Sequence, residues 1–248
     1  MRYLTVSVLF LITLSVYGQG SIDSENKILI RNEQTFYFVL NSNGWGGGFT
    51  KGKMVNIYRK KIYTAELVII KDAKELKINP YNPEYNRFVY GKSNVFFNLR
   101  LSYGNLINLY QKKDKNGIEV RWFYNIGPAI GILKPVYYVT NINPYKTDRF
   151  SSSLHTITSI YGGAPFMQGF GELSIVPGAF AKVGGSFEFS KKDALVNAIE
   201  GGVSLDIFAK NINIMANDKN KFYFLAIFIS YRFGKIINPR AVKTKKDE

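Results

Sequence analysis

Residues Phe222–Phe233, FYFLAIFISYRF, decide the fold of this chain. Side chains of a β-strand alternate between two faces, and one face of this run is apolar and ends in two aromatics: Tyr223, Leu225, Ile227, Ile229, Tyr231 and Phe233. The other face becomes polar at Ser230 and Arg232. A strand that crosses a bilayer needs about 9–11 tilted residues, apolar toward lipid, with aromatics at the headgroup boundary. The run therefore fits a membrane strand, and a core strand of a soluble sandwich is the alternative.

Similar alternation recurs upstream. In the segment that begins at Gly117, for example, Trp122 and Tyr124 share an apolar face opposite Glu119 and Arg121. Eight strands are expected, at about Glu33–Ser42, Trp45–Tyr58, Ile62–Ile70, Asn94–Tyr110, from Gly117 onward, Pro177–Ser190, Ala194–Phe208 and Phe222–Phe233.

Two further sequence signals concern the first turn and the fifth strand. Asn43-Gly44 is a strong signal for a two-residue hairpin. Pro128 and Pro135 are expected above the fifth membrane crossing, because proline cannot donate a hydrogen bond in a paired central strand.

The predicted connections alternate in length. Short basic turns follow the second, fourth and sixth strands, whereas long loops follow the third, fifth and seventh, at about 71–93, 140–176 and 209–221. Only the first hairpin departs from this order. Short turns on one side and long loops on the other are typical of outer-membrane barrels, with the short turns periplasmic. The sequence thus predicts an all-β protein, an eight-stranded antiparallel up-and-down transmembrane β-barrel with both termini in the periplasm.

The N-terminus predicts a secretory signal peptide over residues 1–18. Arg2 provides the positive start, Val6–Leu14 is an apolar stretch too short to cross a membrane as a helix, and cleavage is expected after Gly18. The expected organisation is a periplasmic lead at 19–32, the barrel at 33–235 and a basic periplasmic tail at 236–248. Secretion argues against a nucleic-acid partner, although the net charge is +15. Outer-membrane lipids, lipopolysaccharide and other outer-membrane proteins are the expected partners, and ordinary solvated turns are the alternative explanation of the basic clusters.

These alternating strands, with the aromatic pair Tyr231 and Phe233 in the last one, resemble the small eight-stranded outer-membrane barrels of the OmpA/OmpX type. Together with the predicted signal ending near Gly18-Gln19, they look like such proteins of the Bacteroidota. The resemblance covers nearly the whole mature chain and includes no motif specific to an activity. One departure is that such barrels often end on the terminal aromatic, whereas this chain continues from Gly234 to Glu248.

The polar faces of the strands predict a charge network inside the barrel, since lipid cannot hydrate a charge. The candidates are Glu66, Arg100, Glu119, Arg121, Lys182, Glu188, Glu200, Asp206 and Arg232. We expect ion pairs that plug the lumen, with Arg100 as a cross-strand partner of Glu119 and Arg121; a narrow gated pore for small solutes is the alternative. The candidate interfacial aromatics are Tyr103, Trp122, Tyr124, Tyr231 and Phe233.

An enzymatic site is not expected. His155 is the only histidine and lies in a Ser/Thr-rich loop without motif spacing, so a lipid A acyl-modifying site that uses it is an alternative. With no cysteine and one histidine, no metal site and no cofactor are predicted. The predicted function is a structural or interaction role: lipopolysaccharide packing, loop presentation, or membership of an outer-membrane assembly or secretion complex.

Overall fold

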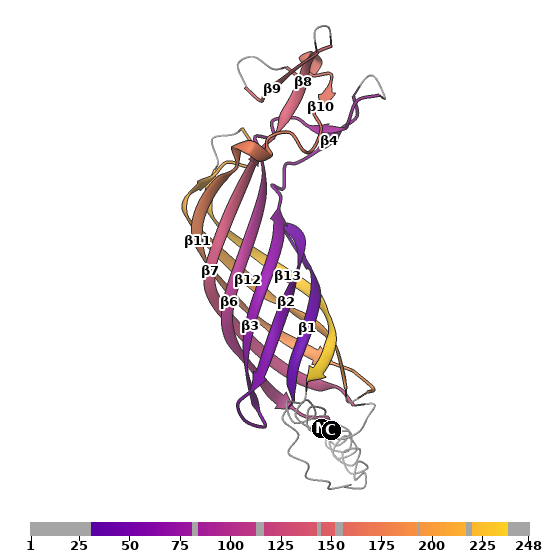
Figure 1. The fold of residues 1–248 in the computed structure, drawn as a ribbon, viewed down its shortest axis with the longest axis vertical. Helices are drawn as coiled ribbons and strands as arrows, with labels where there is room; N and C mark the ends of the chain where they lie inside the picture. The colour runs from indigo at the N-terminus through magenta and orange to yellow at the C-terminus, as the bar shows by residue number, and fades with distance from the viewer. Residues whose placement is uncertain are drawn as a thin grey trace, which may run out of the picture.

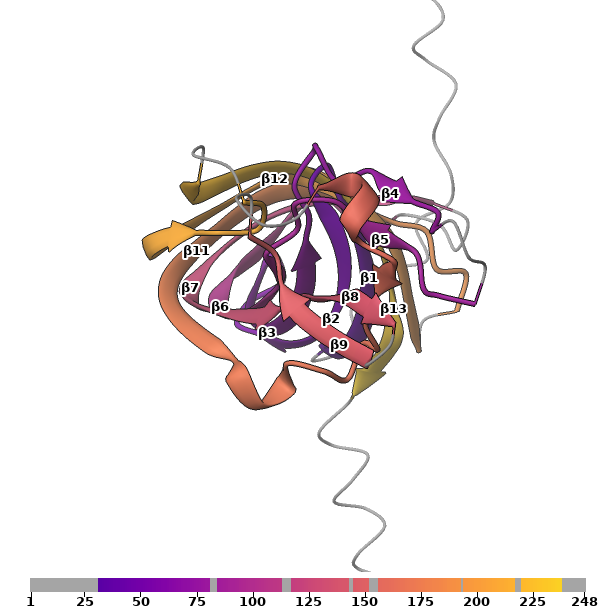
Figure 2. The same ribbon diagram turned by 90° about the horizontal axis from the view of Figure 1, so that it is seen from above.

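The protein is a closed antiparallel β-barrel. The computed structural model describes residues 31–80, 84–112, 117–142, 145–151, 156–192, 194–216 and 220–237. The barrel strands are β1 (Asn32–Asn41), β2 (Gly44–Met54), β3 (Arg59–Ile70), β6 (Asn94–Tyr110), β7 (Glu119–Pro135), β11 (Ser174–Glu188), β12 (Leu195–Ile212) and β13 (Lys221–Ile237). Each of these strands pairs with its neighbour in chain order, and β1 pairs with β13 to close the ring (Figures 1 and 2). The predicted fold, an eight-stranded antiparallel up-and-down barrel, is confirmed.

Alternation of side chains along each strand produces an inside and an outside. In β13, for example, Ala226, Phe228, Ser230 and Arg232 are buried, whereas the residues between them are exposed. A closed barrel leaves no unpaired strand edge, which is why this architecture can present an apolar outer surface. Among the described residues no helix is long and apolar enough to cross a membrane.

The connections at one end of the barrel are folded, and two segments predicted as loops contain strands of their own. The segment after β3 holds β4 (Lys77–Ile78) and β5 (Phe88–Val89), and the segment after β7 holds β8 (Tyr137–Ile142), β9 (Tyr145–Arg149) and β10 (Gly162–Gly163). Strands β10, β8 and β9 form a three-stranded sheet. Two short 3-10 helices interrupt this segment: η1 (Ile157–Ser159) lies between β9 and β10 in the chain, and η2 (Phe170–Glu172) follows β10. We call this assembly of β4, β5 and β8–β10 the platform (Figure 1).

The platform has its own small core. Phe88, Tyr138 and Ile160 are buried together, and partly buried Ile78, Tyr90, Val136 and Phe150 pack against them. The Tyr138 hydroxyl lies 2.6 Å from the carbonyl oxygen of Val89 and 2.7 Å from that of Lys92. These contacts join the segment before β6 to the segment after β7, so the two connections fold as one unit.

Two local expectations were wrong. The first hairpin turns at Ser42 and Asn43, one residue earlier than expected, because Asn41 pairs with Gly44 at the start of β2. Strand β2 ends at Met54 and not at Tyr58.

Both prolines, Pro128 and Pro135, lie within β7, and whether they stand above the membrane crossing stays a prediction. The ladder between β6 and β7 lacks the pairs opposite Gly127 and Pro128, and Pro135 is the last residue of the strand. Each proline therefore sits where the missing N–H costs little.

Candidate functional site

The inner faces of the strands carry charge. All nine residues of the predicted network are buried: Glu66, Arg100, Glu119, Arg121, Lys182, Glu188, Glu200, Asp206 and Arg232. They form three groups at different places along the lumen, each supplied by strands from different parts of the sequence.

The central group is built around Arg100, whose side chain has no exposure to solvent. Its guanidinium donates to both carboxylate oxygens of Asp206, from Nε to Oδ1 at 2.9 Å and from Nη2 to Oδ2 at 2.6 Å. A third hydrogen bond runs from Nη1 to Oε1 of Glu66. Arg100 therefore joins β6 to β3 and, across the lumen, to β12, and this corrects the expectation that it would pair with the charges of β7. Planar bidentate recognition of a carboxylate is the geometry that suits arginine.

Glu66 has further partners in the same group. Lys182 donates to its Oε2 at 2.9 Å, and the hydroxyl of Tyr37 donates to the same oxygen at 2.5 Å. The Tyr37 ring passes over Gly48 of the intervening strand β2, where an added Cβ would lie 2.6 Å from the ring. The ammonium of Lys182 also lies 4.2 Å from the ring centre of Phe228. Gly48 in β2 thus provides the space that the hydrogen bond between Tyr37 and Glu66 requires.

A second group lies beside the seam between the first and last strands. Arg232 donates to both oxygens of Glu200, at 2.6 and 2.9 Å, and to the hydroxyl of Thr35 at 3.0 Å. Ser230 adds a hydrogen bond of 3.2 Å to the same carboxylate. These bonds join β12, β13 and β1.

The third group occupies the end of the lumen where β1 begins and β13 ends, which we call the terminal end of the barrel. Glu33 accepts from Lys60 and from Arg121, the latter at 3.4 Å, and Arg121 lies 3.0 Å from Glu188. Glu119 is buried at this end, and no ion pair among the described residues includes it. Apart from Glu119, the buried charges of the predicted network therefore pair with charges of opposite sign, as their removal from water requires.

Sequence reasoning missed two charged members of this group, Glu33 and Lys60. Lys60 was assigned to a turn, but it shares its face with Ile62, Thr64 and Glu66 at two-residue intervals. Strict extension of the alternation by one step would have placed it inside.

Toward the platform the lumen is apolar. Buried side chains of the barrel core gather there: Val39, Val68, Ile70, Phe96, Leu133, Phe208, Ile212 and Phe228. Phe96 and Phe208 contact each other edge to face, with ring centres 5.2 Å apart. Apolar core residues also lie among the charges at the other end, where Leu106 is opposite Lys60 and Phe123 follows Arg121 on the inner face of β7. Side chains therefore fill the lumen along its length, and the ion pairs are concentrated away from the platform.

The outer surface has the opposite character. Along the described strands, the outward positions carry no Asp, Glu, Lys or Arg over these stretches: 36–40, 45–49, 63–69, 95–103, 120–132, 175–187, 195–207 and 223–233. We call this surface the outer band. The five predicted interfacial aromatics, Tyr103, Trp122, Tyr124, Tyr231 and Phe233, all lie on it and are between 37% and 46% exposed.

No constellation for catalysis is assembled among the described residues. His155 lies outside the described residues, so the structure does not test the alternative of an acyl-transfer site that uses it. No group of three or more His, Cys, Asp or Glu side chains in the described part of the chain is placed to hold a metal ion. The side chains inside the barrel form buried ion pairs, and this arrangement is suited to filling the lumen.

Comparison with known proteins found similar solved structures but no similar sequence. No protein-family model matches the chain, and no curated protein matches it. Neisserial surface protein A (NspA) is 6% identical, with 84% of this chain and 97% of that chain covered and a TM-score of 0.47. Ail, the attachment invasion locus protein of Yersinia pestis, is 7% identical, with coverages of 84% and 97% and a TM-score of 0.37.

The N-terminal β-barrel domain of Pseudomonas aeruginosa OprF is also 7% identical, with coverages of 83% and 98% and a TM-score of 0.36. The eight-stranded architecture that the resemblance implied is confirmed by the strand order of the closed ring itself, and nothing about activity follows from the comparisons.

Proposed function

We propose that this protein is an integral outer-membrane barrel with a structural and interaction role: it packs against lipopolysaccharide and other lipids and presents the platform at the cell surface. The outer band carries the proposal. Exposed leucine, isoleucine and aromatic side chains encircle a closed barrel without an interrupting charge. Soluble monomers rarely expose apolar patches larger than a few hundred Å², whereas lipid requires such a surface.

The platform supports the interaction role. It is a folded unit with its own core and not a set of independent loops. Binding surfaces are disproportionately carried on connections that a rigid scaffold positions. A barrel whose lumen is filled leaves the platform as the part of the molecule best suited to meet another macromolecule, including a subunit of an assembly or secretion complex.

A gated pore for small solutes is the second candidate, and the filled lumen argues against it. Arg100, Glu66 and Asp206 span the barrel interior, and an eight-stranded barrel is just wide enough for side chains to fill it. In planar bilayers the purified protein should give little or no conductance. A large, steady conductance would contradict the plug and favour the pore.

Heat modifiability in the outer-membrane fraction tests the membrane assignment. A closed barrel keeps its inter-strand hydrogen bonds in detergent, so unboiled protein should migrate differently from boiled protein on a gel. Recovery from the soluble periplasm, without a shift in migration, would refute the assignment. The orientation with both termini in the periplasm is part of the proposal and is tested separately below.

A further inference from the structure

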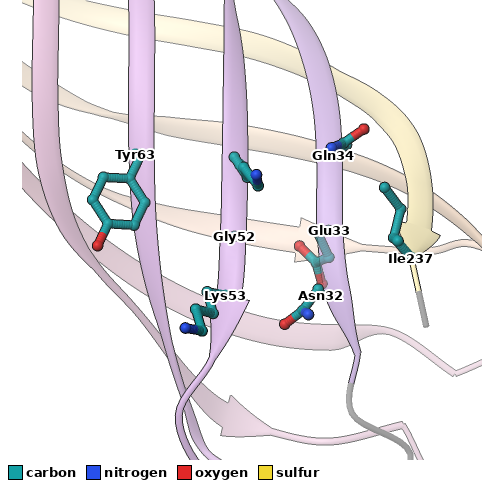
Figure 3. A pocket seen from close by; sticks show the side chains of 8 residues that line it. Asn32, Glu33, Gln34, Gly52, Lys53, Tyr63 and Ile237 are labelled. Atoms are coloured by element: carbon teal, nitrogen blue, oxygen red, sulfur yellow. The ribbon is translucent and has the colours of Figure 1, made fainter. Parts of the chain in front are cut away.

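Two adjoining hollows mark one side of the outer surface. The first, of about 610 Å³, lies at the terminal end of strands β1, β2, β3 and β13 and is bordered by Gln34, Lys51, Lys53 and Tyr63 (Figure 3). The second, of about 510 Å³, also borders Lys51 and Tyr63. Because the two hollows share these residues, a single elongated molecule can occupy both.

The first hollow is basic. Lys53 and Lys61 are paired directly across β2 and β3, and Lys51 is two residues from Lys53 on the same outward face. Like charges in opposite positions of a sheet destabilise it, and no ion pair among the described residues includes these three lysines. The nearby carboxylate of Glu33 cannot serve them, because it is buried on the inner side with Lys60. An anion at this place would offset the repulsion.

The second hollow is an apolar groove within the outer band. Small or compact outward residues, Ala65 and Pro128, alternate with larger neighbours such as Phe49 and Leu101. At its lower end the rings of Tyr63 and Tyr103 have centres 5.2 Å apart. From Tyr63 the groove extends along β3 toward the platform, that is, away from the lysines and into the uncharged surface.

The order of these features follows the order of groups in a lipid. A cluster of positive charge lies at the barrel end, aromatic side chains lie next to it, and an apolar groove continues toward the middle of the outer band. Aromatic and basic side chains at the headgroup level are the usual membrane anchors. A lipid whose phosphate lies at the lysines can therefore extend an acyl chain straight along the groove, toward the middle of the outer band.

We propose that this surface is a specific site for an anionic glycerophospholipid of the membrane leaflet at the terminal end of the barrel. Lys51, Lys53 and Lys61 hold the phosphate, and the groove over Ala65 and Pro128 holds an acyl chain. The site deepens the proposed function and rests on it, since it requires the outer band to face lipid.

Native mass spectrometry of the full-length protein, refolded in a neutral detergent, tests the site. Phosphatidylglycerol is the probe, phosphatidylcholine is its zwitterionic comparator, and lipid A is added as a third arm. One phosphatidylglycerol should be retained in preference to the other two lipids. K51Q should lower its apparent affinity about fivefold and K51Q/K53Q roughly 25-fold, following the usual worth of a basic residue near an anionic surface. K210Q, the same change at an exposed position near the platform end of β12, should leave the affinity unchanged.

A groove variant separates tail recognition from charge. A65W should displace phosphatidylglycerol while leaving the three lysines in place, whereas V203W, on β12 elsewhere in the outer band, should not. Equal retention of phosphatidylglycerol and phosphatidylcholine, unchanged affinity in K51Q/K53Q, or preferential retention of lipid A would each overturn the site. Heat modifiability and flotation with vesicles report the barrel itself. If K51Q/K53Q or A65W passes both tests and still binds phosphatidylglycerol as the wild type does, the lipid site alone is refuted, whereas a wild type that fails both tests refutes the proposed function.

Discussion

Replacement of Arg100 by methionine removes the charge that joins three strands inside the barrel. Methionine keeps a similar length and removes the donors to Asp206 and Glu66. Glu66 retains Lys182 and Tyr37 as partners, whereas Asp206 retains, among the described residues, the amide of Asn98 alone, at 2.8 Å. Most of the loss should therefore arise at Asp206.

The magnitude follows from the burial of the pair. Arg100 and Asp206 are 0% and 1% exposed at their side chains, and removal of one partner of a buried ion pair costs about 3–5 kcal/mol because the other charge remains uncompensated. Replacement of both partners by apolar residues of similar volume is often neutral or stabilising. Arg100→Met should thus cost about 3–5 kcal/mol, and Arg100→Met/Asp206→Leu should recover most of it.

Urea unfolding of the refolded barrel in vesicles measures these differences. Trp45 and Trp122 lie on the outer surface, so their fluorescence reports transfer from lipid to water. Lys210→Met, at an exposed position, is the matched control and should stay within about 0.5 kcal/mol of the wild type. A single variant as stable as this control, or a double variant no more stable than Arg100→Met, would refute the argument that the lumen is an ion-paired plug.

Three further predictions concern orientation, the platform and catalysis. An epitope inserted near Ser152 should be labelled on intact cells and one near Lys113 should not; labelling of the second alone would invert the topology. Burial raises the pKa of the Tyr138 phenol, so its contribution to platform stability should be complete below about pH 10, the usual tyrosine value, and decline as the pH rises further. Hydrogen exchange in β8 should show this decline in the wild type, and an identical decline in Tyr138→Phe would refute it. Neither His155→Ala nor deletion of the gene should alter lipid A acylation as measured by mass spectrometry, and an acyl-chain difference shared by both would make the protein an enzyme.

The strands were predictable where alternation is strict. Strand β6 has the bounds expected from the sequence, Asn94–Tyr110, because apolar and polar residues alternate over most of its length. The end of strand β7 was not predicted, and the sequence does not reveal that the strand can continue through Pro128 because the ladder opposite this residue is incomplete. The sequence shows that proline has no backbone N–H, but the register of the neighbouring strand decides whether a hydrogen bond is lost for that reason.

The sequence predicted which charged residues face the lumen better than it predicted which of them form ion pairs with each other. Alternation places Arg100 and Asp206 on inner faces, but their contact spans 106 residues and depends on the stagger of the closed ring. The platform was missed for a related reason. Tyr138 and Phe88 acquire a common core only when two separate connections meet at the same end of the barrel.

The seam between β1 and β13 sets a constraint on how the barrel forms. Its pairs join residues about 200 positions apart, such as Phe36 and Phe233, so this ladder has the highest loop-closure cost in the molecule. Thr35 meets Arg232 only after closure, and until then the inner face of the open sheet presents its charges to whatever surrounds it. Water tolerates these charges and hydrocarbon does not. The unclosed sheet should therefore be confined to an aqueous or chaperoned environment, with entry into the hydrocarbon and closure of the ring occurring as a single kinetic step.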